Sequence, residues 1–143
     1  ALPISRSGRI AIDRTAQSMG RQLARTEAEH GGGMRLRGTY CCMRCSIALW
    51  RSFAVGALPE SADRLRHGIR HLKSCRDGKG TWGGFPFHYT LTALIDAGSD
   101  EARRELRYAR RAINARLARA PKRATDPYRL RRRRILELAA DAA

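Results

Sequence analysis

The sequence is short of lysine, of acidic residues and of aromatic residues. Of its 29 basic residues only three are lysines, so 26 are arginines, and only 13 acids oppose them. The net charge of +16 favours polyanions such as nucleic acid, an anionic membrane surface or an acidic protein. Aromatic residues are rare among the arginines, with Tyr108 and Tyr128 as exceptions, which argues against a sequence-specific single-strand binder that stacks bases on rings.

The chain also lacks an apolar run of the roughly 18–20 residues that a transmembrane helix needs, so no membrane-spanning segment is predicted. The first residues do not show the basic-then-apolar layout of a secretory signal, and no initiator Met is present. We expect a cytoplasmic protein whose initiator Met was removed or trimmed. The four cysteines suit a reducing compartment better than a disulfide framework, since three of them are crowded into Cys41, Cys42 and Cys45.

No segment keeps the strict alternation of apolar and polar residues that marks a strand. Apolar residues recur with helical spacing instead, which predicts an all-α chain of five or six helices. Ser61, Ser99 and Asp126, the last followed by Pro127, are the expected N-caps. A buried helix, a turn and an amphipathic helix occupy residues 40–76, and the same order recurs over 87–119. This predicts an αα-hairpin repeat, either a short open solenoid or a toroid-like fragment, around the helix at residues 40–55.

Composition divides the chain into three segments. Residues 1–33 form an amphipathic helix that ends in a glycine joint at residues 31–33. Residues 34–121 form the helical core, and residues 122–143 form a basic C-terminal helix.

The core contains the glycine-rich stretch RDGKGTWGGFPF at residues 76–87. Its glycines lack the spacing of a phosphate-binding P-loop, and the segment before it is predicted to be a helix instead of a strand. Trp82, Phe85 and Phe87 would be unfavourable in water, so we expect the loop to fold back onto the helices as a tight corner. Trp50, Phe53 and Trp82 should therefore lie in or against the core.

Residues 68–98 resemble one repeat of the α/α-toroid proteins, the squalene–hopene cyclases and the beta subunits of protein prenyltransferases. The resemblance is carried by Asp77-Gly78, by Gly80-Thr81-Trp82 and by Thr92-Ala93-Leu94, which stand in matching order. The family's usual Gln before the loop, the Asp-rich proton donor of the cyclases and the zinc triad of the prenyltransferases are missing. The resemblance therefore implies an architecture and no activity.

The cysteines and histidines form a candidate metal site. Cys42 and Cys45 make a C-x2-C pair, Cys41 and Cys45 would share a helix face, and His71 and Cys75 are spaced in the same way on the next helix. Two antiparallel helices could bring four of these side chains into a tetrahedral zinc site, namely Cys41 or Cys42 with Cys45, His71 and Cys75. The alternative is a set of small buried thiols in a helix interface, with no cofactor.

A second hypothesis is an enzyme or a small-molecule or lipid-binding protein with a pocket at the glycine-rich loop. Its lining would be His71, Cys75, Trp82, Phe85, His88 and Tyr89. Cys75 beside His71 could act as a nucleophile with a base. No pair of acids lies in an apolar setting, because most acids alternate with arginines as helix-surface partners, so no catalytic residues are assigned.

The hypothesis we favour from the sequence is a non-enzymatic binding module that presents a basic surface to an anionic partner, either nucleic acid or an acidic protein. Arginines near the start of the last helix oppose its macrodipole, so they do not stabilise that helix. A partner phosphate or carboxylate would offset their repulsion. The predicted anion-binding residues are Arg104, Arg107, Arg111, Arg131, Arg132, Arg133 and Arg134. The alternative is a solvated helix surface.

Overall fold

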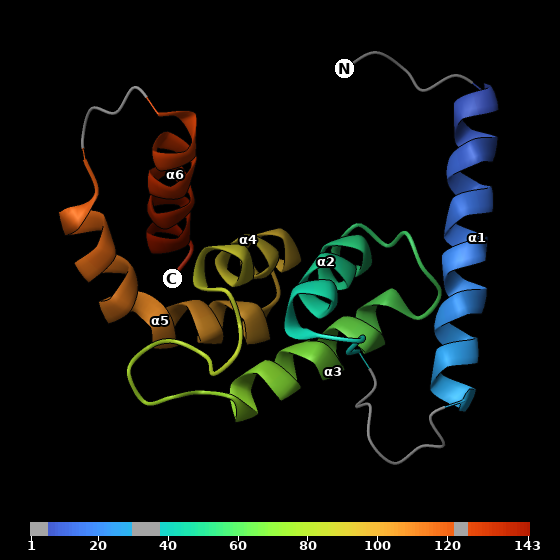
Figure 1. Ribbon diagram of the computed structural model, residues 1–143, viewed down its shortest axis with the longest axis horizontal. Coiled ribbons are helices and arrows are strands. Elements are labelled where there is room, and N and C mark those ends of the chain that lie inside the picture. The colour runs from blue at the N-terminus through green and yellow to red at the C-terminus, as the bar shows by residue number, and fades with distance from the viewer. Residues whose placement is uncertain (1–5, 30–37, 122–125) are drawn as a thin grey trace.

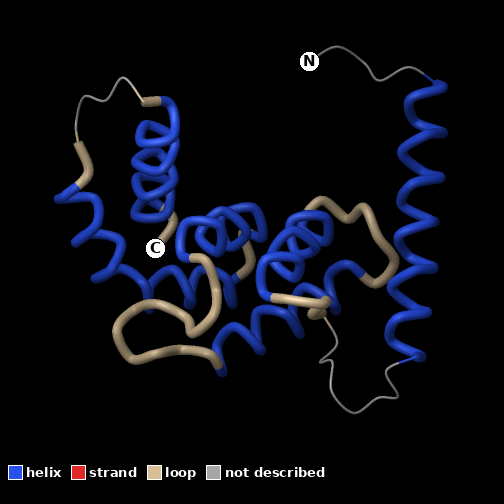
Figure 2. Tube along the Cα trace, viewed as in Figure 1, coloured by secondary structure: helices blue, strands red, loops and turns tan. Residues whose placement is uncertain are grey.

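The computed structural model describes residues 6–29, 38–121 and 126–143, and the regular structure in these residues is helical (Figures 1 and 2). An isolated β-bridge between Arg76 and Trp82 is present, but no strand occurs in the described part of the chain. The prediction of an all-α chain with five or six helices is confirmed. The six helices of the described residues are α1 (Arg6–Glu29), α2 (Met43–Ala54), α3 (Ser61–Ser74), α4 (Phe87–Ala97), α5 (Asp100–Arg119) and α6 (Pro127–Asp141).

The helices pack as two adjoining hairpins with a further helix at each end of the chain. α2 packs against α3 and α4, while α4 also packs against α5 and α6. α3 contacts α5, and α5 contacts α6. In Figure 1, α2 and α4 lie next to each other above α3 and α5, and α1 stands at the right-hand edge. The pairing of α2 with α3 and of α4 with α5 follows the predicted order, while a true repeat stays a prediction.

The core forms around α2 and α4, because both helices carry apolar residues on most faces. Trp50 and Phe53 of α2 are 1% and 2% exposed, and Trp82 is 2% exposed, so the prediction that these three rings are buried is confirmed. The Trp50 ring stacks on Phe85 with centroids 5.7 Å apart, and its Nε1–H donates to the carbonyl of Gly38 at 2.6 Å. Burial of large rings with their N–H groups bonded stabilises this part of the core.

Two of the three predicted N-caps are confirmed and one is wrong. Ser99 accepts a hydrogen bond from the backbone N–H of Ala102, and Asp126 accepts one from Tyr128. Ser61 is the first residue of α3 instead of its cap, and its hydroxyl donates to the carbonyl of Leu58. Glu60 occupies the cap position in a left-handed conformation with φ of 55°. A local hydrogen bond to the preceding turn thus competed with the capping bond.

The glycine-rich loop is a tight corner, as expected. Asp77 organises it, because its carboxylate accepts bonds from the Thr81 hydroxyl and from the backbone N–H groups of Lys79 and Thr81. These bonds, the Thr81 hydroxyl first, hold the pKa of Asp77 well below its usual range. Gly80 has a φ of +83°, and a Cβ there would lie 3.2 Å from the Cβ of Ala112, so the loop backbone approaches α5 closely.

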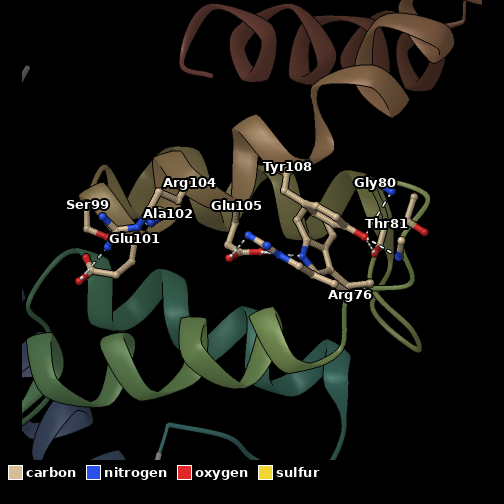
Figure 3. A network of polar contacts seen from close by, with 11 residues as sticks. Arg76, Gly80, Thr81, Ser99, Glu101, Ala102, Arg104, Glu105 and Tyr108 are labelled. Atoms are coloured by element: carbon tan, nitrogen blue, oxygen red, sulfur yellow. Dashed lines mark hydrogen bonds and ion pairs between the residues drawn. The ribbon is translucent and has the colours of Figure 1, made fainter.

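A buried ionic network ties this loop to α5 (Figure 3). Glu105 of α5 is 2% exposed and accepts two bonds from Arg76, from Nε at 3.0 Å and from Nη2 at 2.8 Å. The Trp82 Nε1–H donates to the same carboxylate at 3.0 Å. Glu105 is therefore an exception to the expectation that most acids serve as helix-surface partners. Its spacing from Ala102 and Ala109, on the buried face of α5, was the signal that could have revealed it.

The terminal segments attach to this core unequally. Leu23 of α1 is buried, and Gly20 lies close to the ring of Pro59. The predicted glycine joint at residues 31–33 lies outside the described residues. Leu136 and Ala139 of α6 are buried in the same core as α4 and α5.

Candidate anion-binding site

A basic pocket of about 340 Å³ lies between the start of α4, the end of α5 and the first half of α6. We call it the arginine pocket. Its lining residues are His88, Arg116, Arg119, Ala120, Pro121, Arg129, Arg132, Arg133 and Leu136. All of these residues are described, and none of them is acidic.

Helical spacing explains why three arginines of α6 line this pocket. Arg129, Arg132 and Arg133 stand seven, four and three residues before the buried Leu136, so they share its face of the helix. The inward face of α6 is thus apolar near its C-terminus and arginine-rich near its N-terminus. The pocket opens where the apolar part of that face ends.

The end of α5 follows the same rule. Arg116 is three residues after the buried Ile113 and seven after the buried Ala109, so it extends the inward face of the helix. Its guanidinium lies over the Phe87 ring, 3.9 Å from the centroid, and Nη1 donates to the carbonyl of Ala112 at 3.2 Å. This cation–π contact and hydrogen bond hold the charge at the inner wall of the pocket.

The arginines of the pocket are not equally engaged. Arg133 forms an ion pair with Glu137 at 2.9 Å and donates to the carbonyl of Ala120 at 3.2 Å. Arg129 is paired with Asp126 at 3.6 Å. Arg119 and Arg132 are exposed and have no hydrogen-bond or ion-pair partner in the described part of the chain. Neither guanidinium is therefore neutralised by a described residue.

The local field is positive. Burial, followed by the charges of Arg132 and Arg116, holds the pKa of His88 below its usual value. His88 is the second residue of α4, so the partial positive charge of that helix end lies at the same wall. Arg132 and Arg116 thus add positive potential at this wall, and positive potential favours an anion.

The structure divides the predicted anion-binding arginines into two groups. Arg132 and Arg133 line the pocket, whereas Arg131 and Arg134 do not. The three from α5 (Arg104, Arg107 and Arg111) are exposed outside it, and Arg104 is paired with Glu101 at 3.6 Å. The pocket arginines absent from the predicted set are Arg116, Arg119 and Arg129.

The residues predicted to line a pocket at the glycine-rich loop are also divided. Trp82 and Phe85 are buried in the core, at 2% and 7% exposure, and Tyr89 is exposed. His88 lines the arginine pocket, whose lining includes none of the other five. His71 and Cys75 do come close, with Nε2 and Sγ 3.9 Å apart.

The predicted zinc ligands are only partly brought together. The Sγ atoms of Cys41, Cys42 and Cys45 lie within 4.8 Å of one another, and His71 and Cys75 do not join this group. Cys41 and Cys42 precede α2, so the expectation that Cys41 and Cys45 share a helix face is wrong. The backbone N–H of Cys45 lowers the pKa of Cys42, while hydrogen bonding with Cys41 and then Cys42 raises the pKa of Cys45 to about 12. The group of three could hold a metal ion.

None of the described helices combines the length and the apolar character that crossing a bilayer requires. The resemblance to the α/α-toroid repeats remains an expectation from the sequence. Comparison with models of protein families, with curated proteins and with solved structures found no match to this chain.

Proposed function

We propose that this protein is a non-enzymatic helical binding module that holds a nucleic acid by its phosphates, with the arginine pocket as the principal contact. The observation that carries the proposal is the placement of Arg119 and Arg132. Both guanidiniums are exposed and without a partner among the described residues, beside a pocket lined by three further arginines. A guanidinium binds phosphate through two parallel hydrogen bonds, and it keeps its charge at any physiological pH.

The surroundings of the pocket favour a polymer over a single small anion. Exposed arginines without a partner in the described residues continue outside the pocket on the same two helices, at Arg107, Arg110 and Arg111 of α5 and at Arg131 of α6. Nucleic acid carries a charge every few ångströms, so successive phosphates could reach the pocket and these outer arginines together. Backbone contacts of this kind hold a nucleic acid without reading its sequence.

A salt titration of two matched double variants tests the proposal. Arg119→Gln with Arg132→Gln removes the two unpaired pocket charges, while Arg107→Gln with Arg131→Gln removes two unpaired charges outside it. Each variant loses two positive charges, one from α5 and one from α6. Binding to a generic duplex and to an RNA is measured at several salt concentrations, with circular dichroism to check folding.

The pocket variant should bind more weakly than the outer variant at every salt concentration. For a duplex, loss of two phosphate contacts should also reduce the slope of log affinity against log salt by about 1.8. Equal losses of binding affinity in the two variants would show that binding depends on the net charge alone and that the pocket has no special role. If neither nucleic acid binds at low salt, the proposal fails and an acidic protein becomes the better candidate.

Two further expectations accompany this function. The four cysteines are all free thiols, which fits the cytoplasmic location expected from the sequence. We further propose that the paired helices α2–α3 and α4–α5 are stacked repeats that carry the basic helices.

The proposed binding of nucleic acid uses no metal ion. A zinc ion would be held by the cysteines at the start of α2.

A further inference from the structure

The three cysteines at the start of α2 form a separate cluster of metal-ligating side chains. Their Sγ atoms lie within 4.8 Å of one another. Cys41 and Cys42 are exposed and Cys45 is half-buried, so an ion can reach all three from solvent. None of these residues lines the arginine pocket, and no cysteine has a role in the function proposed above.

Local backbone structure brings these sulfurs together. Cys42 is the N-cap of α2 in an extended conformation, with φ of −153° and ψ of 171°. Its Sγ accepts a hydrogen bond from the backbone N–H of Cys45 at 3.4 Å. This bond places the two sulfurs of the C-x2-C pair at the first turn of the helix, with Cys41 beside them.

The spacing is close to that of a thiolate metal site. Zinc–sulfur bonds of about 2.3 Å put two sulfurs of a tetrahedral site about 3.8 Å apart. The separations within this cluster exceed that value by no more than about 1 Å, which side-chain rotation of exposed cysteines can supply. We propose that Cys41, Cys42 and Cys45 form a three-thiolate site for a thiophilic metal ion, Zn²⁺ or Cu⁺, at the start of α2.

The donor set defines the coordination. No His, Cys, Asp or Glu of the described residues joins the group as a fourth ligand. Three thiolates complete the coordination of Cu⁺, which prefers soft sulfur ligands. With Zn²⁺ they leave a fourth position open to water or to a ligand from a partner. The N-terminal end of α2 offsets part of the negative charge that three thiolates carry.

The chain offers well-matched variants for a test. Cys42→Ser removes one ligand and keeps a good N-cap residue, so the start of α2 should be preserved. Cys45→Ser removes a second ligand. Cys75→Ser is the control, because Cys75 is a half-buried free thiol outside the group. Circular dichroism of each variant, without metal, checks that the helices are intact.

The full chain is first reduced, and the reductant is then removed under anaerobic conditions. The reduced protein is titrated separately with Zn²⁺ and with Cu⁺ in the presence of a competing chelator. One ion per chain is expected, with three metal–sulfur bonds in X-ray absorption, at about 2.3 Å for zinc. Cys42→Ser and Cys45→Ser should each weaken binding by at least about 100-fold, since loss of supporting residues alone costs 10- to 100-fold. The Cys75→Ser variant should bind like the unaltered protein.

Two results would overturn the proposal. One is failure of both ions to bind the reduced protein more tightly than they bind a variant with Cys41, Cys42 and Cys45 all replaced by serine. The other is an equal loss in Cys75→Ser and Cys42→Ser, which would place the ion elsewhere. Comparison of the two titrations assigns the site to zinc or to copper.

Discussion

Replacement of Glu105 by Gln tests whether the buried network of Figure 3 holds the glycine-rich loop onto α5. The carboxylate accepts three hydrogen bonds, two from Arg76 and one from Trp82. A Gln side chain of the same shape loses the charge, and its NH₂ group must face a donor. Loss of a hydrogen bond to a charged group costs about 1.5–3 kcal/mol, and loss of one partner of a buried ion pair costs about 3–5 kcal/mol.

The exposure of Arg76 decides where in this range the value should fall. Its side chain is 31% exposed, so the guanidinium left behind can still be hydrated, whereas the carboxylate side chain is only 2% exposed. We therefore expect Glu105→Gln to lower the free energy of unfolding by about 2–3 kcal/mol. Urea unfolding measures this loss, and the m-value should not change because the same surface is exposed on unfolding.

Glu101→Gln is the control on the same helix. Glu101 pairs with Arg104 at 3.6 Å, but the two side chains are 39% and 57% exposed. An exposed pair of this kind contributes less than about 1 kcal/mol, so the control should lose well under 1 kcal/mol. Equal losses in the two variants, or a loss below about 0.5 kcal/mol for Glu105→Gln, would refute the view that the network stabilises the loop.

Trp82→Ala should lower the free energy of unfolding by about 3–5 kcal/mol, because it empties a buried aromatic site and removes a hydrogen-bond donor to Glu105. An unchanged melting temperature would show that the loop is not part of the core. The folded state depresses the pKa of His88, so the unfolded chain binds that proton more readily and stability should fall as pH drops below about 6.5. An anion in the arginine pocket should raise the pKa of His88, so binding should strengthen over the same fall in pH. NMR titration of His88 with and without an oligonucleotide measures this shift, with His67 as the control, and a pKa that the oligonucleotide leaves unchanged would contradict the site.

The features of the fold that could be predicted from the sequence are local ones. Ser99 and Asp126 begin their helices as predicted, because a capping bond involves only the next two or three residues. Trp82 of the glycine-rich loop was correctly placed in the core because large rings are unfavourable in water. Ser61 was misplaced since two local bonds competed for one hydroxyl, and the sequence does not say which is stronger.

The sequence alone determined that the chain is helical, that it is strongly basic and that its cysteines are crowded, because periodicity, net charge and spacing are properties of neighbours along the chain. Tertiary packing decided which arginines line one pocket. Arg116 and Arg132 come from different helices, and only the contact of α5 with α6 brings both to one pocket. The partners of the buried Glu105 also depend on packing. Arg76 and Trp82 lie far from Glu105 in the sequence, and only the fold brings them to its carboxylate. An ionic site of this kind depends on which faces of separate helices meet, and helical spacing identifies a face without identifying its neighbour.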